Sequence, residues 1–181
     1  MTGLVRWHIT MSLDGFITGP GESMDFVSGH ADRMPASARE VVRTTGALLA
    51  GRNWYDVAME RYNGLDGVYG GAWRGPVFVM THRSAPEAAD PSITFLAGAI
   101  ETGLAAAREA ADGRDVVVFG ADVARQCLKA GLLDEILVHL APVLLGDGVR
   151  LVSDPTLRVD LERTELGETG GLTDLRFRVL K

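Results

Sequence analysis

Residues 116–123 read Val-Val-Val-Phe-Gly-Ala-Asp-Val, and this stretch decides the fold class. Val and Phe favour a β-strand, and a run that is apolar throughout predicts a strand buried between helices on both faces. Gly120 follows the strand at once, and we expect a helix over Val123–Ala130, with Asp122 as its cap and Gly131 at its end. A buried strand that passes through glycine into a helix is typical of α/β proteins.

Outside this unit, apolar runs alternate with helical patterns. Further strands are predicted at Leu4–Thr10, Ala47–Ala50, Pro76–Met80, Ile93–Leu96, Ile136–Leu145 (interrupted by Pro142) and Leu175–Leu180, the last at an edge or in an antiparallel pair. Helices are predicted at Met34–Thr44 and Gly98–Ala111, and irregular stretches at Met11–Asp25 and Tyr62–Gly75. The pattern predicts one α/β domain over residues 1–181 with a mainly parallel sheet. Ligands of such sheets bind at the carboxyl ends of the strands.

Composition limits the possible functions. The chain has 181 residues, a formal net charge of -6 and 46% hydrophobic residues, which is enough for one sizeable core. An acidic chain lacks the broad basic face that DNA or RNA needs, and no apolar run is long enough to span a membrane. The single cysteine, Cys127, and a start at Met1–Thr10 that does not resemble a signal peptide favour the cytoplasm.

Three predicted strand ends carry groups suited to phosphate. The end at residues 120–123 offers the free N–H groups of a helix start. The end at residues 51–54 places an arginine at a helix start, where only a nearby anion would favour its charge. The end at residues 81–83 combines a hydroxyl, an imidazole and a guanidinium. Each alone also fits an ordinary turn or a solvated side chain, but together they predict a phosphate site. The residues are Gly120, Ala121, Asp122 and Val123 at the first end, Gly51, Arg52 and Trp54 at the second, and Thr81, His82 and Arg83 at the third.

Two carboxylates flank the irregular stretch at residues 11–25. Asp14 or Asp25 could orient a substrate or relay a proton, although Asp14 equally suits a turn and Asp25 a helix cap. Residues 142–148 form an apolar segment with a glycine turn, which suits the floor under a flat ring or the exit of a core strand. No metal site is predicted, because the histidines are scattered along the chain at His8, His30, His82 and His139.

The string Met11-Ser12-Leu13-Asp14-Gly15-Phe16-Ile17 resembles the opening of the reductase domain of the bacterial bifunctional deaminase–reductase of riboflavin biosynthesis, and of related stand-alone dihydrofolate-reductase-like proteins. Similar segments follow in the expected order, and the resemblance covers nearly the whole chain. It implies a dihydrofolate-reductase-like, three-layer α/β fold with a mostly parallel central sheet and an antiparallel C-terminal edge. It also implies an NADPH cofactor, a small-molecule substrate and a homodimer. The later segments are Leu49–Arg52, Val77–Arg83, Val118–Gln126 and Gly131–Gly148.

The resemblance assigns each motif a place. Gly51 and Arg52 would lie along the diphosphate and adenosine, residues 81–83 at the adenosine 2′-phosphate, and residues 120–123 at the diphosphate. Ser12, Asp14, Leu145 and Gly146 would lie near the nicotinamide and the substrate. Trp54 stands where the family usually has Thr, so a hydroxyl for the phosphate is lost there. The chain carries no deaminase signature, which leaves the reductase half alone.

The expected reaction is hydride transfer from NADPH to a polarised C=N or C=O group of a pyrimidine- or pterin-like heterocycle, such as 5-amino-6-(5-phosphoribosylamino)uracil. The proton would come from Asp14, Asp25 or water. One alternative is a dihydrofolate or pterin reductase, which would need a buried carboxylate facing the pterin, and the segment 33–43 offers Glu40 alone. The other is a non-catalytic nucleotide- or flavin-binding module, which the Trp54 substitution favours.

Overall fold

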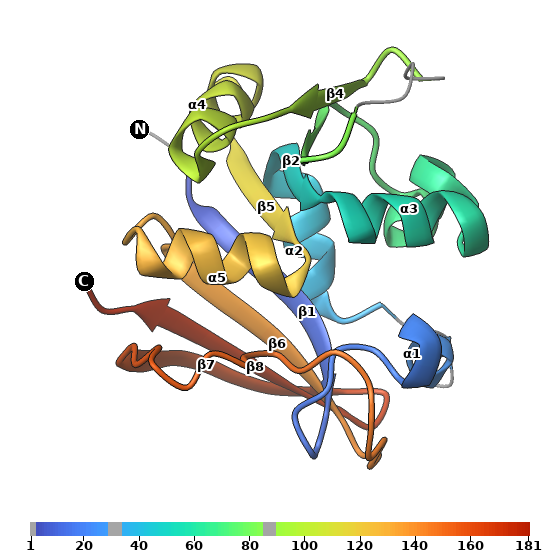
Figure 1. Ribbon diagram of the computed structural model, residues 1–181. Coiled ribbons are helices and arrows are strands. Elements are labelled where there is room, and N and C mark those ends of the chain that lie inside the picture. Colours follow the sequence, from blue (N-terminus) through green and yellow to red (C-terminus); the bar gives the residue numbers. More distant parts are fainter. Residues whose placement is uncertain (1–2, 29–33, 85–89) are drawn as a thin grey trace.

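The computed structural model describes residues 3–28, 34–84 and 90–181, and within them one eight-stranded sheet carries helices on both faces (Figure 1). The strands are β1 (Val5–Ser12), β2 (Thr45–Gly51), β3 (Val77–Met80), β4 (Ile93–Leu96), β5 (Asp115–Phe119), β6 (Glu135–Ala141), β7 (Leu161–Thr169) and β8 (Leu172–Val179). The helices are α1 (Asp25–Ser28), α2 (Ala36–Thr44), α3 (Arg52–Arg61), α4 (Ile100–Ala110) and α5 (Ala121–Lys129), with short 3-10 segments η1 (Pro20–Glu22) and η2 (Gly64–Gly71).

The strand order is β4-β3-β2-β5-β1-β6-β8-β7. Neighbouring strands from β4 to β6 run parallel, whereas β8 is antiparallel to β6, and β7 is antiparallel to β8. The predicted fold class, a mostly parallel sheet with an antiparallel C-terminal edge, is therefore confirmed. The carboxyl ends of the six parallel strands share one edge of the sheet, as the argument from the strand ends requires.

Apolar side chains fix the sheet between its helices. On one face, Leu104 of α4 and Cys127 of α5 pack against the buried side of β1, β2 and β5. On the other face, Val41 of α2, Tyr55 of α3 and Val68 of η2 pack against β2, β3 and β5. Cys127 is fully buried, and this burial raises the pKa of its thiol to about 12. The sheet is thus the middle layer of three.

The sheet face under α2 is more polar than the sequence suggested. Arg6, His8 and Ser12 of β1 are all buried, so β1, unlike the apolar run at residues 116–119, places polar side chains on one face of the sheet. Arg6 is compensated by charge, since its guanidinium lies 3.2 Å from Asp115 and 2.5 Å from Glu135. A buried charge persists only where such partners replace water.

Three expectations about individual elements are also wrong. β6 ends at Ala141 rather than near residue 145, because Pro142 has no N–H to continue the ladder. β7 has no apolar run, since most of its side chains are exposed, and so the sequence pattern did not reveal it. α5 begins at Ala121, and Asp122 does not cap it. The Asp122 carboxylate instead accepts hydrogen bonds from Arg125 and Gln126.

Candidate active site

The three predicted phosphate-suited motifs meet because β3, β2 and β5 are neighbours in the sheet. Gly51 at the end of β2 is in register with Met80 of β3, and Ala50 is in register with Phe119 of β5. Their carboxyl ends open into a cavity of about 1020 Å³. Ten of the predicted cofactor-binding residues line this one cavity: Gly51, Arg52, Trp54, Thr81, His82, Arg83, Gly120, Ala121, Asp122 and Val123.

The start of α5 presents backbone N–H groups to the cavity. Gly120 is the N-cap residue and has a φ of 93°, a conformation that a residue with a Cβ rarely adopts. Among the described residues, no side chain caps this helix. The N–H groups of its first turn therefore have no partner within the helix and can bind an anion at the positive end of the dipole.

The start of α3 lies beside the start of α5. Its N-cap is Gly51, again with no capping side chain in the described part of the protein. A Cβ on Gly51 would lie 3.2 Å from Cγ2 of Val123, and a Cβ on Gly120 would lie 3.8 Å from the backbone N of Gly51. Two helix N-termini thus converge, through two glycines, on the same part of the cavity. Their combined dipoles favour an anionic group there.

Two arginines flank these helix starts and share one carboxylate. Nε of Arg52 lies 2.7 Å from Oδ1 of Asp56, and Nη2 of Arg83 lies 2.7 Å from Oδ2 of Asp56. Partial burial acts to raise the pKa of Asp56, but the hydrogen bonds and charges of both arginines outweigh it and hold the pKa below its ordinary value. The hydroxyl of Thr81 accepts the backbone N–H of Arg83 at 3.1 Å, which fixes the turn that carries this arginine.

Aromatic rings form one wall of the cavity. Trp54 stacks on Phe119, with ring centroids 5.0 Å apart and planes within 3° of parallel. Phe119 contacts the ring of Tyr69 at 5.9 Å, and Tyr69 stacks on the ring of His8 at 5.4 Å. All four rings line the cavity. Trp54 therefore supplies a flat apolar surface at the position where the resemblance implied a hydroxyl.

A buried hydrogen-bonded chain, which the sequence analysis missed, reaches the cavity from under α2. Tyr69 Oη lies 2.8 Å from His8 Nδ1, and His8 Nε2 lies 2.7 Å from Nε2 of His139. His139 Nδ1 in turn lies 2.5 Å from Oδ1 of Asp174. His8 and His139, which are far apart in the sequence, thus contact each other in the fold. The signal was a histidine inside each of two apolar strand runs, but only the pairing of β1 with β6 brings them together.

Asp14 and its neighbours form a turn outside the described cavity lining. Ser12 Oγ donates a hydrogen bond to Asp14 at 2.6 Å, and the N–H groups of Leu145 and Gly146 donate to its carboxylate at 3.1 and 2.7 Å. The hydrogen bond from Ser12 is the largest influence that lowers the pKa of Asp14 to about 2. Both carboxylate oxygens are thus used to join the turn after β1 to the turn after β6.

The second predicted acid, Asp25, is the first residue of α1 and is exposed. It lies outside the described cavity lining, although Met24 and Val27 on either side are part of it. A catalytic role for Asp14 or Asp25 stays a prediction, and the geometry offers other groups closer to the cavity. Arg150 also lines the cavity and was not predicted, since it falls in an irregular segment with no motif around it.

Two further properties bear on function. Within the described ranges, no group of three or more His, Cys, Asp or Glu side chains could hold a metal ion, and His30 lies outside those ranges. None of the described helices combines the length and apolar character needed to cross a membrane.

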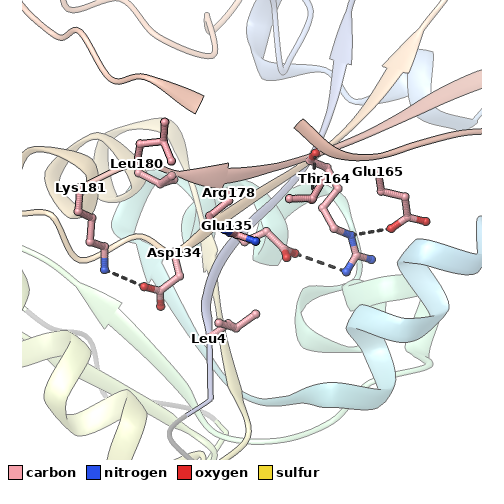
Figure 2. Close-up of a pocket in the computed structure, with 10 residues that line it drawn as sticks. Leu4, Asp134, Glu135, Thr164, Glu165, Arg178, Leu180 and Lys181 are labelled. Atoms are coloured by element: carbon pink, nitrogen blue, oxygen red, sulfur yellow. Dashed lines mark hydrogen bonds and ion pairs between the residues drawn. The ribbon is translucent and has the colours of Figure 1, made fainter. Parts of the chain in front are cut away.

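A second cavity, of about 900 Å³, lies at the opposite ends of β1 and β6, between Leu4 and the last residues of the chain (Figure 2). Its charged groups neutralise one another: Lys181 binds Asp134 at 2.7 Å, and Arg176 lies 3.0 Å from Glu165. This cavity contains none of the predicted site residues.

The comparisons with known proteins identify a family and a fold. The family model of the RibD C-terminal domain matches residues 4–172. A search of curated protein sequences finds no significant match. The family match confirms the resemblance stated from the sequence.

Solved structures show the same fold at low sequence identity. A Shewanella sp. PV-4 protein, named only provisionally as a riboflavin biosynthesis protein, has a TM-score of 0.81 and 19% identity, with 98% of this chain and 99% of that chain covered. The diaminohydroxyphosphoribosylaminopyrimidine deaminase/5-amino-6-(5-phosphoribosylamino)uracil reductase of Thermotoga maritima has a TM-score of 0.68 and 14% identity, over 99% of this chain but 57% of that one. Dihydrofolate reductase from Enterococcus faecalis, complexed with NADP(H), has a TM-score of 0.66 and 14% identity, over 100% and 99% of the two chains.

Proposed function

The chain belongs to the RibD C-terminal domain family, and from this premise we propose that it is a reductase that uses NADPH to reduce a pyrimidine- or pterin-like heterocycle. The favoured substrate class is that of 5-amino-6-(5-phosphoribosylamino)uracil, which the name of the T. maritima relative contains. The observation that carries the proposal is the convergence of two uncapped helix starts and two arginines on one cavity, at the carboxyl ends of β2, β3 and β5.

The residues present fit the cofactor. The diphosphate would lie against the first turns of α3 and α5, where Gly51 and Gly120 leave room for it and the helix dipoles favour its charge. The adenosine 2′-phosphate would lie at Thr81, His82 and Arg83, all of which line the same cavity. A guanidinium suits a phosphate monoester because it donates paired hydrogen bonds.

The other half of the cavity fits a flat heterocycle. Apolar side chains from separate elements line it, among them Val27 of α1, Ala38 of α2 and Val68 of η2. The polar groups of the lining include Thr18, Glu22, Tyr69 and the histidine pair. A largely apolar cavity with a few placed polar groups is the usual form of a small-molecule site.

The bound cofactor would supply the hydride, and the protein would supply position and field. The ring wall of Trp54, Phe119 and Tyr69 excludes water from one side of the reacting groups. Arg150, which stacks 4.4 Å above the ring of Phe16, contributes positive charge to the same cavity. This charge favours an anionic substrate, such as one that carries a ribosyl phosphate.

The proposal is tested by titration followed by turnover. Isothermal titration with NADPH, NADH and FMN measures which nucleotide binds, and loss of NADPH absorbance with 5-amino-6-(5-phosphoribosylamino)uracil or with dihydrofolate measures reduction. We expect NADPH to bind most tightly and the pyrimidine to be reduced faster than the folate. Turnover of dihydrofolate alone would favour the pterin alternative. NADPH or FMN binding without any turnover would favour the non-catalytic alternative.

We also propose that the protein acts as a homodimer in the cytoplasm. The family resemblance supports both parts, and the buried Cys127, the only cysteine of the chain, suits a reducing compartment. The edge strand β7 supports self-association, since Leu161 and Leu166 on it are exposed by 42% and 60%. Sedimentation equilibrium measures the assembly, and a monomer at micromolar concentration would contradict the dimer.

A further inference from the structure

We infer that Tyr69, His8, His139 and Asp174 form a proton relay, in which the Tyr69 hydroxyl gives the substrate the proton that accompanies the hydride. This inference rests on the proposed reductase function. Tyr69 is assigned as the catalytic residue of the relay because it lines the cavity proposed to hold the substrate, and the other three act through it as positioning residues.

The four groups are continuous in space. The three links measure 2.8, 2.7 and 2.5 Å, so each is a hydrogen bond. The relay runs from η2 to β1, then to β6 and then to β8. The three strands are neighbours in the sheet in that order. Tyr69, His8 and His139 line the cavity, and Asp174 lies behind them at 7% exposure.

All the hydrogen bonds of the relay can point in the same direction. When Asp174 is ionised, it accepts the proton of His139 Nδ1, which leaves His139 Nε2 to accept the Nε2–H of His8. His8 Nδ1 then accepts the hydroxyl of Tyr69, so that each group has one defined tautomer. One added proton at Asp174 reverses every bond and makes Tyr69 a donor toward the cavity.

The step balances. The hydride moves from the reduced nicotinamide to the carbon of a C=N or C=O group, and the proton of Tyr69 Oη moves to its nitrogen or oxygen. Tyr69 regains a proton from His8 Nδ1, His8 Nε2 from His139 Nε2, and His139 Nδ1 from the carboxyl group of Asp174. The products are the oxidised nicotinamide, the reduced substrate and an ionised Asp174. Water in the cavity reloads the relay along the same path after product release.

Burial favours the uncharged forms of His8 and Tyr69. Desolvation, followed by the charges of His139, Arg6 and Arg176, lowers the pKa of His8 well below its usual value. Burial likewise raises the pKa of Tyr69, so its hydroxyl keeps a proton. The two arginines are held by carboxylates on the elements around the relay: Arg6 by Asp115 and Glu135, and Arg176 by Glu40, Glu135 and Glu165.

Both ends of the relay are fixed in place. Asp174 Oδ2 accepts hydrogen bonds from Ser37 at 3.3 Å and from Thr169 at 3.4 Å, which leaves Oδ1 for His139. Tyr69 has a φ of 52°, a left-handed conformation that is unusual for an aromatic residue. Backbone strain of this kind concentrates at functional sites, and here it lets η2 place the ring of Tyr69 between His8 and Phe119.

The first test needs neither substrate nor cofactor. Histidine ¹⁵N resonances report which ring nitrogen carries the proton in the wild type, Asp174→Asn, Tyr69→Phe and Glu40→Gln. Glu40→Gln is the matched control, since it removes a carboxylate from the same layer that binds Arg176 instead of an imidazole. We expect Asp174→Asn to change the protonation of His8, which it does not contact, and Glu40→Gln to leave it unchanged. A change confined to His139 would overturn the relay.

The second test follows single turnovers of the NADPH complex with 5-amino-6-(5-phosphoribosylamino)uracil across pH, in H₂O and in D₂O. Tyr69→Phe keeps the ring stack, so NADPH should bind as in the wild type, while hydride transfer slows by about 100-fold and its solvent isotope effect disappears. Asp174→Asn should alter the pH profile. An unchanged rate and isotope effect in Tyr69→Phe would overturn the relay. A wild type that binds no NADPH or reduces no substrate defeats the proposed function, and the ¹⁵N resonances still decide the relay.

Discussion

Arg83 places its Nη2 atom 2.7 Å from Oδ2 of Asp56, while the other oxygen of that carboxylate is taken by Arg52. Two guanidinium groups thus share one negative charge, and the cluster keeps a net positive charge beside the helix starts. Arg83 is 57% exposed at its side chain and Arg52 is 18% exposed. Arg83 is accordingly the member that can turn toward an incoming phosphate.

Arg83→Ala should weaken NADPH binding by about 10- to 100-fold, the loss expected for a charged hydrogen bond. NADH binding should change little, because NADH lacks the 2′-phosphate. Isothermal titration with both nucleotides measures this difference. An equal loss for NADPH and NADH would show that Arg83 does not recognise the 2′-phosphate.

Gly120→Ala should reduce both stability and cofactor affinity. A Cβ at a φ of 93° strains the backbone by about 1–3 kcal/mol, and it would occupy space at the start of α5. Gly131→Ala is the matched control: it also has a positive φ, of 65°, but lies at the far end of α5 with no atom within 4 Å of the added Cβ. Urea unfolding and NADPH titration of both variants separate strain from occupation of the site, and equal NADPH affinities would refute the diphosphate position.

Asp14→Asn should make the thermal midpoint of unfolding less dependent on pH in the acid range. The folded pKa of Asp14 is about 2, below its ordinary value of 3.8, so its stabilisation is present above pH 4 or so and is lost as the pH falls toward 2. Thermal midpoints between pH 2 and pH 7 measure this loss. Ser12→Ala should reduce the effect in part, since the N–H groups of Leu145 and Gly146 still bind the carboxylate. An Asp14→Asn curve parallel to the wild type would contradict this.

Arg6→Ala should destabilise the protein by about 3–5 kcal/mol, because it leaves Asp115 without its buried counter-ion and Glu135 with only Arg176, at 3.7 Å. The exposed pair of Arg158 with Asp160 provides the control, since its side chains are 88% and 71% exposed. Arg158→Ala should cost no more than about 1 kcal/mol. Guanidinium unfolding of both variants measures the contrast, and similar losses would refute the buried ion pair.

Ten residues that the sequence predicted to bind a cofactor line one cavity, and they could be picked out because they belong to local motifs. Gly51-Arg52 and Gly120-Ala121 mark strand-to-helix turns, and the parallel sheet alone is enough to bring such turns to one edge. The order of the strands then sets which turns are neighbours, and that order rests on long-range pairing.

The sequence could not predict the hydrogen-bonded chain from Tyr69 to Asp174, because its members meet only through long-range strand pairing. His8 and His139 lie 131 residues apart and meet only through the pairing of β1 with β6. Tyr69 reaches them through a left-handed backbone that no residue preference indicates. β7 was not predicted from the sequence, because strand prediction relies on a buried apolar face and this strand has none.

The buried thiol of Cys127 is a probe for local opening of the fold. Its sulfur is fully enclosed under α5, and its raised pKa keeps it out of the reactive thiolate form. An alkylating reagent can therefore modify the native chain only when this helix detaches from the sheet. Since the same helix is the one proposed to bind the diphosphate at its first turn, the labelling half-life would time its opening and lengthen as nucleotide is added.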